Sequence, residues 1–169
     1  MVDETTDQAD AYFEEDDDFD RLFGIVADGV IGAAGGLAGT ALMMGVLFVA
    51  WQLGAFDVGA FRSLAATIGL GEHELANLIG FVIFLGNGMV PFPLLFASLM
   101  EYMPGDRLEV RGMFFGAVLW TGFVFAFYEG YTGVTLGLYL VLTFVAHLAY
   151  GFGLGRVFGY LSNRPDSFV

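Results

Sequence analysis

Residues 25–51 read IVADGVIGAAGGLAGTALMMGVLFVAW and decide the fold class of this chain. The stretch is long enough to cross about 30 Å of hydrocarbon as an α-helix, because each residue advances a helix by about 1.5 Å. Its one charged residue, Asp28, lies near the start, where it can reach the membrane interface. This pattern predicts a transmembrane helix.

The composition of the whole chain also indicates a membrane protein. Of its 169 residues, 57% are hydrophobic and 15% are charged, and the mean hydropathy is +0.70. A soluble domain of this size would need more polar side chains to cover its surface. The composition therefore argues against a water-soluble enzyme.

Further apolar stretches follow the first, at about 76–100, 112–128 and 134–160. The second stretch contains Pro91 and Pro93, so we expect a kink in the turn before Pro91. Together the stretches predict an all-α, polytopic membrane protein, with a four-transmembrane-helix bundle over residues 25–160.

The net charge of −13 is concentrated at the N-terminus, where residues 1–20 hold ten of the 19 acidic residues. Such a block of like charge cannot bury enough apolar surface to offset its ordering entropy, so we expect an acidic, disordered tail over residues 1–24. A solvated tail and a tail that docks onto a basic partner are the alternatives. The acidity gives no reason to expect a nucleic-acid partner.

Arginine supplies all six basic residues and predicts the orientation. Arg62 lies on one side of the predicted membrane, and the opposite side has Arg21, Arg107, Arg111, Arg156 and Arg164. Because basic residues favour cytoplasmic loops, we expect a multi-pass protein of the cell membrane with both termini in the cytoplasm, residues 161–169 forming a short C-terminal tail. The absence of Lys from an acidic chain indicates a halophilic archaeon as the source.

The loop between the first two stretches, residues 52–75, is long and amphiphilic. Asp57 is a candidate N-cap for the segment VGAFRSLAATIG that follows it. We expect a short helix lying on the outer membrane interface. A re-entrant loop is the alternative, given the glycine content.

Two faces of small residues predict close helix packing. The first stretch carries, at helical spacing, Gly32, Gly35, Gly36 and Gly39. The last stretch carries, four residues apart, Thr143, His147, Gly151, Gly155 and Gly159. We expect the two faces to meet inside the bundle. A glycine-lined pocket for a lipid or quinone tail and a seam between copies of the chain are the alternatives.

Counting along the stretches places a set of polar residues near the middle of the bilayer: Thr40, Asn87, Thr121 and His147. Polar side chains at that depth are costly unless they are partnered. Asn87 and His147 lie at similar depths, so we expect a hydrogen bond between them. The cluster is either a polar clamp between helices or a site for a quinone headgroup, a proton relay or haem.

No signature of catalysis or of cofactor binding accompanies these residues. The lack of Cys excludes disulfides, thiolate chemistry and Cys-ligated metals. The second histidine, His73, lies about 18 Å along a helix from the depth of His147, too far to share one haem iron. Neither a nucleophile–base pair nor an HExxH motif is visible. We therefore expect no catalytic residue, no metal and no cofactor.

Several segments together resemble an uncharacterised family of small four-span membrane proteins of haloarchaea: GGLAGT, FLGNGMVPFPLLF, YMPGDR, FFGAVLWTGFVFAF and HLAYGFGLG. The resemblance covers about residues 25–160 and implies an association with respiratory complexes, particularly haem–copper oxidases. It transfers no site residue.

We expect an integral membrane protein that is not an enzyme but an accessory or assembly subunit of a haloarchaeal membrane complex. Its partners would be the lipid bilayer and either other subunits or a second copy of itself. The alternative is a small membrane carrier or a redox component that binds quinone or haem.

Overall fold

The computed structural model describes residues 29–162, and this part of the chain is helical, without a β-strand. The helices that are long and apolar enough to cross a membrane are Gly29–Gln52, Ala76–Tyr102, Leu108–Ala126 and Gly133–Ser162. The predicted all-α architecture with four spans is therefore confirmed. The acidic tail, residues 25–28 of the first predicted stretch and residues 163–169 lie outside the described residues.

The second span is interrupted at the predicted position. Helix α3 (Ala76–Met89) ends at Val90, whose φ of −126° and ψ of −70° are not helical, and α4 (Pro91–Leu99) begins directly after it. A short 3-10 helix, η2 (Met100–Tyr102), completes the span. Pro91 stands at the start of α4, where its missing N–H removes no hydrogen bond within that helix. The kink before Pro91 is confirmed.

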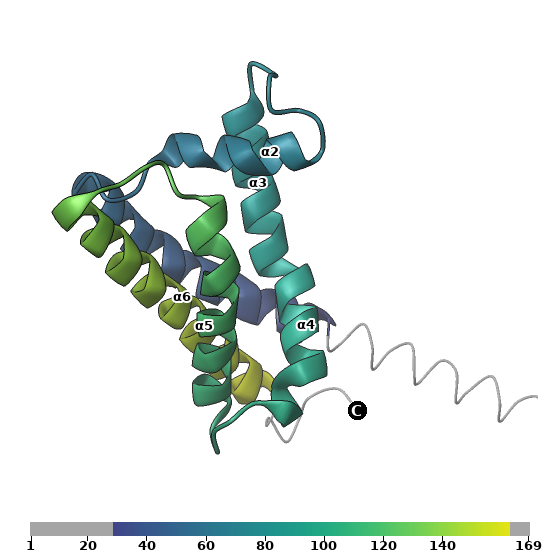
Figure 1. Ribbon diagram of the computed structural model, residues 1–169. Helices are drawn as coiled ribbons and strands as arrows, with labels where there is room; N and C mark the ends of the chain where they lie inside the picture. Colours follow the sequence, from purple (N-terminus) through teal and green to yellow (C-terminus); the bar gives the residue numbers. More distant parts are fainter. Residues whose placement is uncertain (1–28, 163–169) are drawn as a thin grey trace, which may run out of the picture.

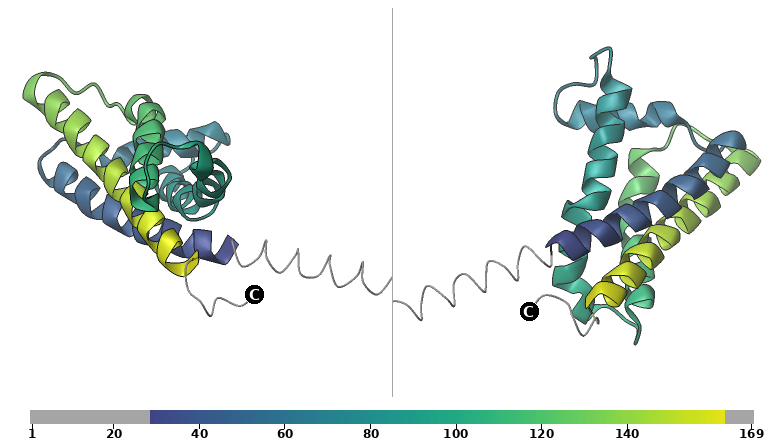
Figure 2. Two further views of the ribbon diagram at one scale, coloured as in Figure 1. Left: turned by 90° about the horizontal axis from the view of Figure 1, so that it is seen from below. Right: turned by 180° about the vertical axis from the view of Figure 1, so that it is seen from behind.

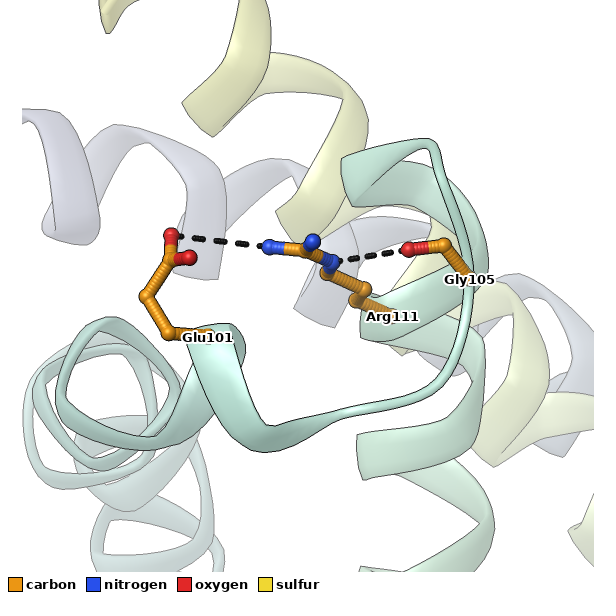
Figure 3. A network of polar contacts seen from close by, with 3 residues as sticks. All are labelled: Glu101, Gly105 and Arg111. Carbon is orange, nitrogen blue, oxygen red and sulfur yellow. Dashed lines mark hydrogen bonds and ion pairs between the residues drawn. The ribbon is translucent and has the colours of Figure 1, made fainter.

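The third span, α5 (Leu108–Ala126), begins and ends earlier than the predicted 112–128. Its first turns contain Arg111, whose Nε donates to the Gly105 carbonyl at 2.9 Å and whose Nη1 lies 3.5 Å from Glu101 Oε1 (Figure 3). A span predicted from hydropathy ends where charged residues begin. The helix itself includes Arg111, because the bonding partners of this side chain lie close to it at the end of the span.

The fourth span, α6 (Gly133–Ser162), lies beside α5 and beside the first span (Figures 1 and 2). The first span turns two glycines towards α6, since Gly35 faces the Leu154 carbonyl and Gly39 faces the Tyr150 carbonyl. The two other predicted packing glycines of this span, Gly32 and Gly36, face the region around Pro93 where α3 ends and α4 begins. One small-residue face therefore packs against two different helices.

Helix α5 contacts the small face of α6, formed by Gly151, Gly155 and Gly159. It carries a matching pair, because a methyl group added at Gly112 would overlap the Gly151 carbonyl and one at Gly116 would overlap the His147 carbonyl. The glycine face of the first span does lie against α6, as expected, but it meets Gly153 and Leu154, whereas the predicted face of α6 meets α5. The physical reason is that α5 also has a small face, which lets its backbone approach that of α6 directly.

A short helical segment crosses the end of α3, formed by η1 (Val58–Phe61) and α2 (Arg62–Thr67) (Figure 1). Asp57 caps it as predicted, since its Oδ1 accepts a hydrogen bond of 2.7 Å from the Gly59 N–H. Phe61 is buried in a group of rings that we call the phenylalanine cluster: Phe56, Phe61, Phe81, Phe84, Phe123 and Phe127. Through this cluster the short helical segment packs against the membrane spans.

Candidate functional site

A cavity of about 400 Å³ lies between the spans, and the polar residues predicted near the middle of the bilayer all line it: Thr40, Asn87, Thr121 and His147. Each of them comes from a different span. Most of the remaining lining is apolar and includes Met43, Leu64, Phe84, Phe92, Leu119 and Phe123. The fold thus collects into one cavity the polar groups that the sequence placed at one depth.

The cavity opens along one face of α5. The lining residues of this face are exposed, and we call them the mouth: Val118, Thr121, Gly122 and Ala126. The mouth runs from Val118 in the middle of α5 to Ala126 at its C-terminal end. Because these residues lie within a membrane span, an exposed face here meets lipid rather than water.

The His147 side chain is almost completely enclosed in this cavity, with 3% of it exposed. Its Nδ1 lies 2.8 Å from the Thr143 carbonyl oxygen. A carbonyl oxygen only accepts, so Nδ1 carries the proton and, in the neutral ring, Nε2 carries the lone pair. Among the described residues no hydrogen bond reaches Nε2. The Phe123 ring meets the imidazole at an angle of 61°, with the ring centres 4.6 Å apart.

Thr40 and Asn87 also have polar atoms without partners. Thr40 is 4% exposed, and its buried Oγ1 makes no hydrogen bond to any residue that the structure describes. Asn87 is half-buried, and within residues 29–162 its side-chain amide is not hydrogen-bonded. Among the described residues the predicted bond between Asn87 and His147 is not formed, and the imidazole N–H is bonded to the Thr143 carbonyl one turn away on α6. Thr121 differs, since its hydroxyl donates to the Val118 carbonyl at 2.7 Å.

The family of the chain follows from a match over most of its length. A family model, described as a family of unknown function (DUF6789), covers residues 26–169. The chain belongs to the DUF6789 family. No curated protein and no solved structure matches it. Membership agrees with the expected uncharacterised family and assigns no reaction to DUF6789 proteins.

Other side chains make hydrogen bonds between the spans of this DUF6789 protein. Trp120 Nε1 donates to Thr143 Oγ1 at 3.0 Å and joins α5 to α6. The Tyr150 hydroxyl donates to the Gly88 carbonyl at 2.8 Å and joins α6 to α3. One signal was available, because each of these Trp and Tyr side chains brings an N–H or O–H donor into an apolar span and must find an acceptor. These two side chains form polar clamps between the spans.

His73, the other histidine, is exposed, and its Nδ1 accepts a hydrogen bond of 3.1 Å from the Leu75 N–H. No group of three or more potential metal ligands occurs within the described part of the DUF6789 chain. His73 therefore acts in the local turn before α3.

Proposed function

We propose that this protein is a non-catalytic membrane protein that binds a small amphiphilic molecule in the cavity between its spans. The observation that carries the proposal is the set of unpartnered polar atoms, His147 Nε2, Thr40 Oγ1 and the Asn87 amide, in the wall of an apolar cavity. Small-molecule sites typically combine an apolar lining with a few convergent polar groups. A bound ligand would supply the partners that these groups lack at a depth where lacking one is costly.

A Gly122→Leu substitution tests this proposal by filling the mouth. No atom lies within 4 Å of the position of an added Cβ at Gly122, so a larger side chain can start from this position without a clash at its Cβ. We expect 4-nonylphenol, measured by titration calorimetry in lipid nanodiscs, to bind about tenfold more weakly or not at all. Gly137→Leu is the control, because Gly137 has equally open surroundings on α6 and lies outside the cavity. Unchanged binding by Gly122→Leu would show that the cavity is not the site.

We also propose that the protein is an accessory or assembly subunit of a larger membrane complex in a haloarchaeon, with a respiratory complex as the first candidate. The low burial of the second span favours this, since 17% of its apolar window is buried within the chain and the rest is available to lipid or to other subunits. Gentle solubilisation followed by mass spectrometry of the co-purifying proteins tests it. Recovery only as a free monomer or homodimer would contradict a role as a subunit.

We further propose that both termini lie in the cytoplasm. The support is the grouping of arginines at the end of the bundle where α5 begins and α6 ends, marked by the Arg156–Glu109 ion pair of 2.8 Å. The chain has no Cys, so single cysteines can be introduced without background. Glu72 and Asp106 are exposed at opposite ends of the spans. We expect Glu72→Cys to be labelled only from outside the cell and Asp106→Cys only from inside, and the reverse pattern would invert the topology.

A further inference from the structure

We infer that the cavity takes a neutral, hydroxyl-bearing amphiphile, which enters from the lipid through the mouth on α5 and donates its O–H to His147 Nε2. The inference rests on the proposed function and narrows it to one chemical class of ligand. Three independent features of the cavity carry it: the tautomer of His147, the free hydroxyl of Thr40 and the charge of the lining.

The first feature is the hydrogen bond that orients His147. Because the Thr143 carbonyl takes the Nδ1 proton at 2.8 Å, the neutral ring presents only an acceptor to the cavity. A ligand with an O–H group satisfies this acceptor. A ketone, ether or quinone oxygen has lone pairs alone and would leave Nε2 buried without a partner. Sites built around such an unpaired group discriminate between ligands that satisfy it and isosteres that do not.

The second feature is Thr40. A threonine inside a helix commonly donates to a carbonyl of its own helix, as Thr143 does to Tyr139 at 2.6 Å and Thr121 does to Val118 at 2.7 Å. Thr40 Oγ1 makes no such bond within the described residues, although it is fully buried. Its hydroxyl has no bond to give up, so a rotation of the side chain about χ1 would let it donate to the ligand oxygen while that oxygen donates to His147. A ligand hydroxyl can take both roles at once.

The third feature is the absence of charge from the cavity. None of the described residues that line it is Arg, Asp or Glu. A carboxylate or phosphate headgroup would be buried there without a cation, which costs far more than a hydroxyl with two hydrogen bonds. A neutral headgroup is thus favoured, and its apolar chain can leave through the mouth, where Val118 and Gly122 face the lipid.

Matched probes test the inference on the full chain in lipid nanodiscs. The probes are 4-nonylphenol, its methyl ether 4-nonylanisole and 4-nonylbenzoic acid, which share one alkyl chain and differ in the headgroup. We expect the phenol to bind about tenfold more tightly than the ether, the difference made by one hydrogen bond to a buried acceptor. The ionised acid should bind more weakly than the phenol.

Nitrogen NMR of the imidazoles reports the contact directly and needs no change at the site. The chain has two histidines, so His73→Gln, at an exposed position, leaves the signal of His147 alone. We expect the Nε2 resonance to move with the phenol and not with the ether. Two further variants distinguish the role of His147 from that of Thr40. His147→Phe should abolish the preference for the phenol over the ether. Thr40→Val should weaken the binding of both probes and keep the preference.

The outcomes distinguish this inference from the proposed function. Equal binding of phenol and ether, both blocked by Gly122→Leu, would overturn the hydroxyl class and leave the cavity as a binding site. Tighter binding of the acid would overturn the neutral class. A preference for phenol without any shift of Nε2 would overturn the role of His147. Failure of all three probes to bind would remove the proposed function itself.

Discussion

A Gly151→Ala substitution should destabilise the folded protein by about 3 kcal/mol, at the upper end of the usual effect of overpacking. The added methyl group would overlap the Gly112 carbonyl and approach the Met113 N–H. These are backbone atoms, so no flexible side chain can move aside, and α5 and α6 would have to separate. Thermal unfolding in detergent, followed by intrinsic tryptophan fluorescence, measures the effect.

The matched control is Gly137→Ala. It makes the same change in the same helix, at a position where an added Cβ meets no atom within 4 Å. Alanine also has a higher helix propensity than glycine, by up to about 1 kcal/mol. We therefore expect Gly137→Ala to leave the melting temperature unchanged or to raise it. Similar destabilisation by both variants would mean that helix α6 does not approach α5 through Gly151.

A Phe61→Ala substitution should cost about 3 kcal/mol of folding stability, at the lower end of the usual effect for a buried aromatic ring. Phe61 is 2% exposed, and its ring centre lies 5.2 Å from those of Phe81 and Phe84 and 5.7 Å from that of Phe127. Removing the ring leaves a void in the middle of the phenylalanine cluster. The segment η1–α2 would then lose its main attachment, which limited proteolysis within residues 58–71 should detect.

Phe125→Ala is the control for this prediction. It removes the same ring from a position that is 83% exposed, so no packed contact is lost. We expect a change in stability within about 0.5 kcal/mol and no new proteolytic site in the segment. If Phe125→Ala proved as destabilising as Phe61→Ala, the phenylalanine cluster would not be what holds the segment in place.

Local chemistry explains what could be predicted along the chain. Hydrophobic length is a property of consecutive residues, and it predicted four spans, which the structure confirms. Proline lacks an N–H wherever it stands, and Pro91 accordingly marks the break between α3 and α4. The Asp57 cap is equally local, since its carboxylate reaches an N–H two residues away. These features depend on neighbours in sequence and on no distant contact.

Depth in the membrane was also predictable, because it follows from counting residues along a helix. That count brought Thr40, Asn87, Thr121 and His147 to one level, and the structure places them around one cavity. Counting residues does not predict how each helix is rotated about its axis or which groups form hydrogen bonds with each other. The count favoured a bond between Asn87 and His147, whereas in the structure the imidazole N–H is bonded to the Thr143 carbonyl.

The sequence by itself determined the number of spans, the kink, the cap and the depth of the polar residues, because each of these depends on residues close together in the chain. Only the tertiary structure decided which helices meet. A glycine face shows that some helix can approach closely, but not which one. In the folded chain α6 meets α5 through Gly151 and meets the first span through Gly153, which lies against Gly39. The cavity around His147 Nε2 also depends on the tertiary structure, because the residues that line it come from four spans that pack together only in the folded chain.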